Sequence, residues 1–130
     1  MYSLPKTEIL RGKTSLDKLF SEGERMSEFP FRVFYKINPP TEGIPALRFG
    51  IVVPKRVSKL AHERNRIKRI AREGYRLNRQ PFTAILEGQS KQADFFLVYT
   101  GKIKPNSAKI HNKIILILQR LTQDHETTAE

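Results

Sequence analysis

The segment from Lys55 to Gln80 constrains the fold most, because it carries ten basic residues and only two acidic ones. Between about residues 61 and 79 a narrow apolar stripe recurs at helical spacing and consists of Ile67, Ile70, Ala71 and Gly74. The ten bases are Lys55, Arg56, Lys59, Arg64, Arg66, Lys68, Arg69, Arg72, Arg76 and Arg79. The pattern predicts a helix that packs one thin stripe against a core and turns its cations outward.

A charged helix face is usually solvated surface on which acids pair with bases three or four positions away. Here the segment keeps +8 of the net charge of +11, and like charges at that spacing repel. A helix that tolerates this repulsion favours an external polyanion such as nucleic acid. We expect RNA, because arginine predominates and no helix-turn-helix or zinc-finger pattern is present. If about six bases each neutralise a phosphate, log affinity falls with log salt at a slope of about −5.

Several function classes are excluded or disfavoured by residue content. The chain has no cysteine, which excludes a disulfide framework, a thiolate zinc site and a cysteine nucleophile. His62, His111 and His125 lack metal-ligand spacing, and the carboxylates are sparse and unpaired, so we assign no catalytic residue and no metal site. The longest apolar run, 114–118, is far too short to span a membrane, and the N-terminus lacks the pattern of a signal peptide. We expect a soluble, cytoplasmic protein without a membrane partner.

The other elements are predicted from hydrophobic periodicity and from the residues that end helices and strands. We expect a short helix over 15–22 and strands over 29–37 and 47–53, the two strands forming an antiparallel hairpin with a long loop. Pro81 is expected to stop the basic helix, and 81–92 has no firm assignment. A buried strand is expected over 93–100, followed by a last helix whose apolar face holds Ile110, Ile114, Ile117, Leu118 and Leu121. The prediction is one domain over 1–130, an α/β sandwich of one sheet and its helices, with a polar tail at 124–130.

The centre of the basic helix carries a specific motif. Residues 64–73 read Arg-Asn-Arg-Ile-Lys-Arg-Ile-Ala-Arg-Glu, which resembles the RNR motif in the protein subunit of bacterial ribonuclease P. Segments 16–23, 49–56 and 93–100 also resemble the corresponding parts of that family, so the similarity spans about Leu10 to Leu121. The resemblance implies an α-β-β-β-α-β-α fold of the α+β type with one mixed sheet and a left-handed βαβ crossover. Chirality rules alone predict a right-handed crossover.

The resemblance also implies a function. In that family the RNA subunit is the catalyst, and the protein alone is not expected to cleave. The protein binds the ribonuclease P RNA through the basic helix and holds the 5′ leader of precursor tRNA in a cleft between that helix and the sheet. Endonucleolytic removal of the leader then gives the mature tRNA 5′ end. Mg²⁺ acts through the RNA subunit and is not bound tightly by the protein, which is expected to be a monomer in a 1:1 complex.

Site residues are carried over position by position. The RNA-binding motif corresponds to Arg64, Asn65, Arg66, Lys68, Arg69 and Arg72, and the leader cleft to Phe20, Phe34, Arg32, Lys36, Lys55 and Arg56. Phe20 and Phe34 are also open to a plain core role, although Arg32 and Lys36 flank Phe34 on one strand face, which suits stacking on single-stranded bases. Leu16, Val52 and the segment 58–63 depart from the family pattern. The alternative function is a structural RNA-binding protein of the ribosomal type, which composition alone does not separate from the first.

Overall fold

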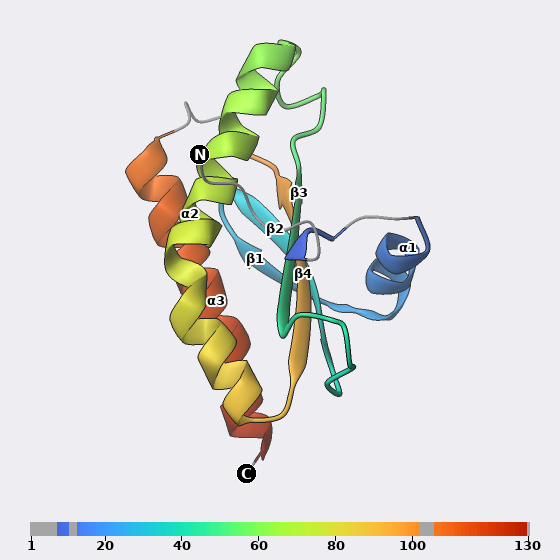
Figure 1. Ribbon diagram of the computed structural model, residues 1–130. Coiled ribbons are helices and arrows are strands. Elements are labelled where there is room, and N and C mark those ends of the chain that lie inside the picture. Colours follow the sequence, from blue (N-terminus) through green and yellow to red (C-terminus); the bar gives the residue numbers. More distant parts are fainter. Residues whose placement is uncertain (1–7, 11–12, 102–105, 130) are drawn as a thin grey trace.

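The computed structural model describes residues 8–10, 13–101 and 106–129 and has a four-stranded sheet with helices on both faces (Figure 1). In chain order the elements are α1 (Lys13–Glu22), β1 (Glu24–Glu28), β2 (Phe31–Asn38), β3 (Leu47–Val52), α2 (Ala61–Gly88), β4 (Gln92–Tyr99) and α3 (Ser107–Ala129). Helices α2 and α3 cover one face of the sheet, and α1 lies on the other. The expected α-β-β-β-α-β-α order is confirmed.

The strands lie in the order β1-β2-β4-β3, so the hairpin expected between β2 and β3 is wrong. Instead β4 lies between them, antiparallel to β2 and parallel to β3. The reason is that β4 is buried on both faces, with seven of its eight residues buried. Such a strand needs a neighbour on each side and a layer over each face, and the central position supplies both. The hairpin partner of β2 is β1, through a turn that includes Phe29 and Pro30.

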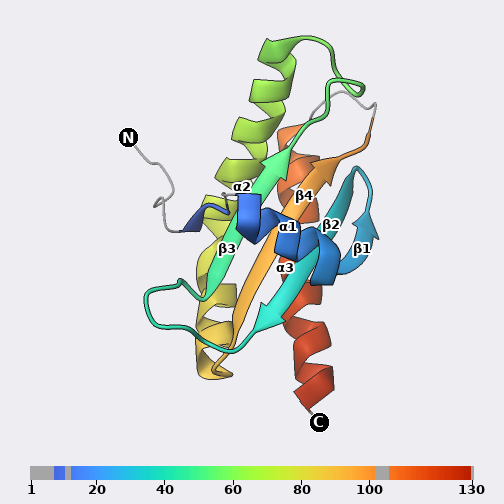
Figure 2. The same ribbon diagram turned by 90° about the vertical axis from the view of Figure 1, so that its right-hand side faces the viewer.

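The connection from β3 through α2 to β4 is left-handed, as the resemblance implies. In Figure 2, α1 faces the viewer, α2 lies behind the sheet, and β4 lies to the right of β3 while both strands point upward. With the helix behind the sheet, a right-handed crossover would place β4 on the left. The first turns of α2 extend past the end of the sheet, beyond the arrowheads of β3 and β4 (Figures 1 and 2).

The main core lies between the sheet and the two long helices. Tyr75 of α2 stacks on Phe49 of β3, with ring centroids 4.6 Å apart and planes 10° from parallel. The apolar face of α3 is buried as expected, and it consists of Ile110, Ile114, Ile117, Leu118 and Leu121. Gly74 brings α2 and α3 close together, because a Cβ there would lie 2.8 Å from Cδ2 of His111. At Gly74 the thin apolar stripe of α2 therefore packs closely against α3.

Helix α2 continues through Pro81 to Gly88, so the expected stop at Pro81 is wrong. A proline inside a helix leaves unpaired the carbonyl four residues earlier, here that of Leu77. Leu77 is 57% exposed and Pro81 is also exposed, so water can satisfy that carbonyl. Leu86, which is fully buried, anchors the turns that follow. At the other end of the chain the backbone of α3 includes 124–129, the expected polar tail, and residue 130 lies outside the described residues.

A second, smaller core lies under α1 on the opposite face of the sheet. Its buried members are Leu10, Leu19 and Phe96, with Leu16, Phe20, Phe34 and Val98 packed around them. Gly50 of β3 lies beside Phe96 in the register, and a Cβ at position 50 would lie 2.4 Å from Cδ1 of that ring. The glycine therefore makes room for the aromatic side chain that supports α1.

We predict that Gly50→Ala lowers the free energy of unfolding by about 1–3 kcal/mol, because the added methyl group overpacks a ring that cannot move freely. Gly88→Ala is the matched control, since nothing lies within 4 Å of a Cβ at that position. Urea denaturation followed by far-UV circular dichroism measures both. Equal stability of the Gly50 variant and the wild type would contradict the packing described here.

Candidate functional site

The outward face of α2 and the loop before it form a cationic surface. Exposed side chains on it belong to Lys55, Arg56, Lys59, Asn65, Arg66, Arg69 and Arg72, and half-buried ones to Arg64, Lys68, Arg76 and Arg79. The buried stripe, centred on Ile67, Ala71 and Tyr75, faces the core. Because the first turns of α2 extend past the sheet, this end of the helix is open to a large partner.

Arg64 fixes the loop between β3 and α2. One of its guanidinium nitrogens donates hydrogen bonds to the carbonyls of Ser58 at 3.0 Å and Lys59 at 2.9 Å. Ser58 in turn donates through its hydroxyl to Glu63 at 2.9 Å. A turn on the carbonyl of Pro54 precedes these contacts, so the loop that carries Lys55 and Arg56 is held to the start of the helix. The structure thus gives Arg64 a positioning role within the chain.

Two cations near the middle of α2 are held by carboxylates. Arg76 pairs with Glu73, and this hydrogen bond holds the pKa of the Glu73 carboxyl below its usual value. Arg79 donates to both carboxylate oxygens of Glu8, at 2.7 and 3.2 Å, which raises the pKa of Arg79. Tyr75 also donates its hydroxyl to Glu8, at 3.2 Å, and burial raises the pKa of that hydroxyl. Glu8 therefore ties the N-terminal segment to α2.

The cations without such partners concentrate between residues 55 and 72. They are Lys55, Arg56, Lys59, Arg66, Lys68, Arg69 and Arg72. None of these side chains donates a hydrogen bond or forms an ion pair within the part of the chain that the structure describes. Their positive charge is uncompensated locally, which is the arrangement expected of a surface that meets phosphates. Asn65 lies among them and is exposed.

The aromatic residues expected in the cleft lie on the opposite face of the sheet from α2. The main core lies between the buried stripe of α2 and the sheet, and the leader cleft expected between the basic helix and the sheet stays a prediction. Phe20 of α1 instead meets Phe34 of β2 edge to face, with centroids 5.0 Å apart, and meets Phe96 at 5.5 Å. Phe20 and Phe34 are both half-buried, so they contribute to the smaller core and also reach the surface.

Arg25 lies beside Phe34 and is a further candidate for the site, which the sequence pattern did not indicate. Its guanidinium carbon lies 5.3 Å from the centroid of the Phe34 ring, in a cation–π arrangement. The register of β1 on β2 places the two residues opposite each other. The signal was available in the alternation of segment 24–28, but with only five residues and one buried apolar side chain, Met26, the strand is weak in sequence.

The strand register separates the other expected cleft residues into two rows. Arg32 shares a row with Val98 and Val52, at the end of the sheet where β3 runs into the loop of Lys55 and Arg56. Arg32 is exposed and has no partner among the described residues. Phe34 lies one row further in.

Lys36 lies at the far end of the same face and is already paired. Its ammonium group contacts Glu22 of α1 at 2.7 Å, and that hydrogen bond lowers the pKa of the Glu22 carboxyl. The row of Lys36 continues through Asp94 to Arg48, away from the basic loop. The structure therefore places Arg32 toward the end of the sheet that leads to Lys55 and Arg56, Lys36 toward the other end, and Phe34 between them.

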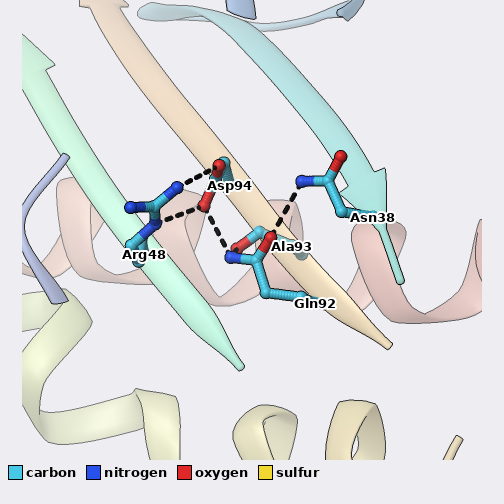
Figure 3. Close-up of polar contacts among 5 residues, drawn as sticks. All are labelled: Asn38, Arg48, Gln92, Ala93 and Asp94. Carbon is cyan, nitrogen blue, oxygen red and sulfur yellow. Dashed lines mark hydrogen bonds and ion pairs between the residues drawn. The ribbon is translucent and has the colours of Figure 1, made fainter. Parts of the chain in front are cut away.

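A buried polar network that sequence analysis also missed lies beside Lys36 (Figure 3). Arg48 donates two hydrogen bonds of 2.8 Å to the two oxygens of Asp94, which raises the pKa of the guanidinium group. Gln92 donates to Asp94 at 2.6 Å, and Asn38 donates to Gln92 at 2.8 Å. The network joins β2, β4 and β3 at the end of the sheet away from α2's first turns. Because its charges are paired internally, we assign it to the fold.

Within the described ranges, no three His, Asp or Glu side chains gather closely enough to hold a metal ion. No helix there is both long and apolar enough to cross a membrane.

Comparison with known proteins identifies the family. The sequence profile described as Ribonuclease P matches residues 4–122. The chain belongs to the bacterial ribonuclease P protein family. The Ribonuclease P protein component of Chlorobaculum tepidum is 36% identical over 94 residues, which cover 71% of this chain and 61% of that protein. The corresponding protein of Porphyromonas gingivalis is 31% identical over 103 residues, which cover 78% of this chain and 74% of that protein.

Solved structures of ribonuclease P proteins share the fold. The Staphylococcus aureus protein superposes with a TM-score of 0.68 at 18% identity, covering 88% of this chain and 94% of that one. The Thermotoga maritima protein gives a TM-score of 0.65 at 26% identity, covering 87% and 96%. The α-β-β-β-α-β-α order and mixed sheet are therefore those of the family.

Proposed function

We propose that this protein, a subunit of the tRNA-processing enzyme ribonuclease P, binds the RNA subunit through the unpaired cations at 55–72 and binds the 5′ leader of precursor tRNA on the α1 face. In this proposal the RNA subunit cleaves the precursor endonucleolytically to give the mature tRNA 5′ end. The active complex contains one RNA subunit and one protein subunit. The proposal also takes Mg²⁺ to act through the RNA subunit. The observation that carries the proposal is the run of seven cations on α2 and the loop before it that have no partner among the described residues.

The cationic surface suits a folded RNA. Arg66, Arg69 and Arg72 follow one another at three-residue intervals, each step rising about 4.5 Å along the helix. Their guanidinium groups need no rearrangement of ion pairs before they meet phosphates, since none is engaged within the described chain. Arg64 and the turn at Pro54 fix the loop of Lys55 and Arg56 to the same end. Affinity then comes from counterion release by a preformed surface.

The α1 face suits a single strand. Phe34 offers a half-buried ring, Arg25 lies over it, and Arg32 lies one row nearer to Lys55 and Arg56. Aromatic rings beside cations bind single-stranded bases by stacking and by contact with the backbone. A leader that runs along this face of β2 would pass from Phe20 and Phe34 to Arg32 and then to the loop of Lys55 and Arg56.

The function is tested by cleavage of a precursor tRNA at low Mg²⁺ with protein alone, bacterial ribonuclease P RNA alone, and both together. We expect efficient 5′ cleavage only in the combined reaction. Cleavage by the protein alone would overturn the assignment of the chemistry to RNA. Tight RNA binding with no gain in cleavage, repeated with RNA subunits of different bacteria, would favour the ribosomal type of RNA-binding protein.

We predict that Arg66→Ala combined with Arg69→Ala weakens binding to ribonuclease P RNA and flattens its salt dependence. Loss of two phosphate contacts should reduce the magnitude of the log–log slope by about 1.8. Filter binding at several salt concentrations measures this slope. Arg120→Ala is the control, because Arg120 lies on α3 and pairs with Glu28; an equal change of slope in this variant would contradict a localised surface.

We predict that Phe34→Leu preserves affinity for ribonuclease P RNA and lowers the preference of the complex for precursor over mature tRNA. Leucine keeps most of the apolar volume against Phe20 but removes the stacking surface, worth about 1–3 kcal/mol per base. Arg32→Ala should act in the same direction. Lys36→Ala should have a smaller effect, because the ammonium group of Lys36 is already paired with Glu22. Binding of the reconstituted complex to the two tRNA forms decides the order, and a larger effect at Lys36 would contradict it.

A further inference from the structure

A hollow of about 410 Å³ lies on the α3 side of the sheet, away from both surfaces described above. It is formed by the β1–β2 turn, the end of β4 and the first turns of α3. Its walls are Phe29, Pro30, Tyr99 and Ile110, and its rim carries Asn106, Lys109, Asn112 and Lys113. The volume falls within the range of sites that hold small organic groups.

Phe29 is exposed in a way that no other described aromatic side chain is. It is 53% exposed, whereas the remaining aromatic residues in the described ranges are buried or half-buried. The turn that carries it is fixed, because the carbonyl of Pro30 accepts hydrogen bonds from the amide of Thr100 at 2.8 Å and from its hydroxyl at 3.2 Å. Gly101 lies behind the turn, and a Cβ there would lie 2.6 Å from Cβ of Pro30 and 3.3 Å from Cζ of Phe29. The ring is thus held at the surface by the fold.

The polar rim of the hollow favours an anionic occupant. Glu28, the neighbouring acid, is neutralised by Arg120 at 2.7 Å and Lys113 at 3.5 Å. Lys109 is exposed, and its ammonium group has no partner within the described residues. Asn112 is also exposed, and its amide can both donate and accept hydrogen bonds. Among the described residues, the apolar wall, the unpaired ammonium group of Lys109 and the exposed amide of Asn112 match a nucleotide, which combines a flat base, hydrogen-bonding edges and a phosphate.

The position of the hollow allows RNA to reach it. The strand register places the start of β2 and the end of β4 at the same end of the sheet as the end of β3, which leads into the basic loop. Figure 2 shows the β1–β2 turn, the arrowheads of β3 and β4 and the first turns of α2 at this upper end. The hollow and the cationic surface therefore lie at one end of the molecule, on opposite edges of the sheet.

We propose that this hollow binds one unstacked nucleotide of a single-stranded RNA segment, with the base on Phe29, the phosphate at Lys109 and the base edge at Asn112. The proposal rests on the proposed function, because it takes the RNA as a strand of the ribonuclease P complex. A protein partner is disfavoured, since a stable protein interface buries about 800 Å² on each side and avoids unpaired lysines at its centre.

The test uses Phe29→Trp, because the chain contains no tryptophan and the new indole becomes the sole such reporter. Ribonuclease P RNA and then precursor tRNA are added, with binding followed independently by anisotropy of labelled RNA. We expect quenching of the indole fluorescence as RNA binds, since stacking on a base brings the two rings into contact. Ile44→Trp is the control, because Ile44 is 36% exposed and lies between β2 and β3 at the opposite end of the sheet. We expect little quenching there.

Affinity provides a second readout. Phe29→Ala should weaken binding of the RNA whose addition quenches the indole, by about 5- to 150-fold, while Phe29→Tyr should retain it. RNA binding with no quenching at position 29, or with equal quenching at position 44, would overturn the proposal that the hollow binds a nucleotide. The proposed function would remain intact. Failure of the wild-type protein to bind either RNA would overturn both. Quenching that depends on protein concentration without RNA would assign the hollow to a second copy of the chain.

Discussion

The central strand β4 is the element on which both layers of the molecule depend. One of its faces sends Phe95, Leu97 and Tyr99 into the core beneath α2 and α3. Its other face places Phe96 under α1. Along its length it pairs with β2 on one side and β3 on the other. Because β4 contributes side chains to both cores, it fixes the position of α1 relative to α2 and α3. The surfaces on the two faces of the sheet are fixed relative to each other for the same reason.

Acidic residues divide the cations into two groups. Glu8, Glu28, Glu73 and Asp94 each hold an arginine, and these pairs join segments that are distant in sequence or brace a helix turn. The acids lie outside the stretch from Lys55 to Arg72 except for Glu63, which accepts from the hydroxyl of Ser58. The cations of this stretch therefore keep their charge available. The same residue type braces the structure where a carboxylate lies within reach, and it carries the proposed RNA contacts where none does.

Local pattern predicted the elements better than their pairing. The basic helix is predicted by the spacing of Ile67, Ala71 and Gly74. The same helical periodicity predicts that the cations point outward. The neighbour of β2 could not be found in this way, because strand pairing depends on burial of β4 on both faces, a property of the assembled sheet. Pro81 misled for a related reason: its cost depends on whether the carbonyl of Leu77 faces water. The family resemblance supplied the crossover hand, which periodicity does not encode.

The candidate site was predicted as a set of residues but not as a geometry. Arg66, Lys68, Arg69 and Arg72 have no partner among the described residues, whereas Arg64 donates to the carbonyls of Ser58 and Lys59. Phe20 and Phe34 meet each other as a cleft pair would, yet on the face opposite to α2. Side chains that alternate along a strand reveal which residues share a face, and only packing decides which helix covers that face.

The insertion of β4 between β2 and β3 has a consequence for synthesis of the chain. Until residues 92–99 have left the ribosome, β2 and β3 have no shared neighbour, and the apolar stripe of α2 has neither a finished sheet nor α3 to cover it. The strongly cationic segment is thus made well before the fold that supports it. The core that supports the basic surface is therefore complete only after the last strand and the helix that follows it have been made.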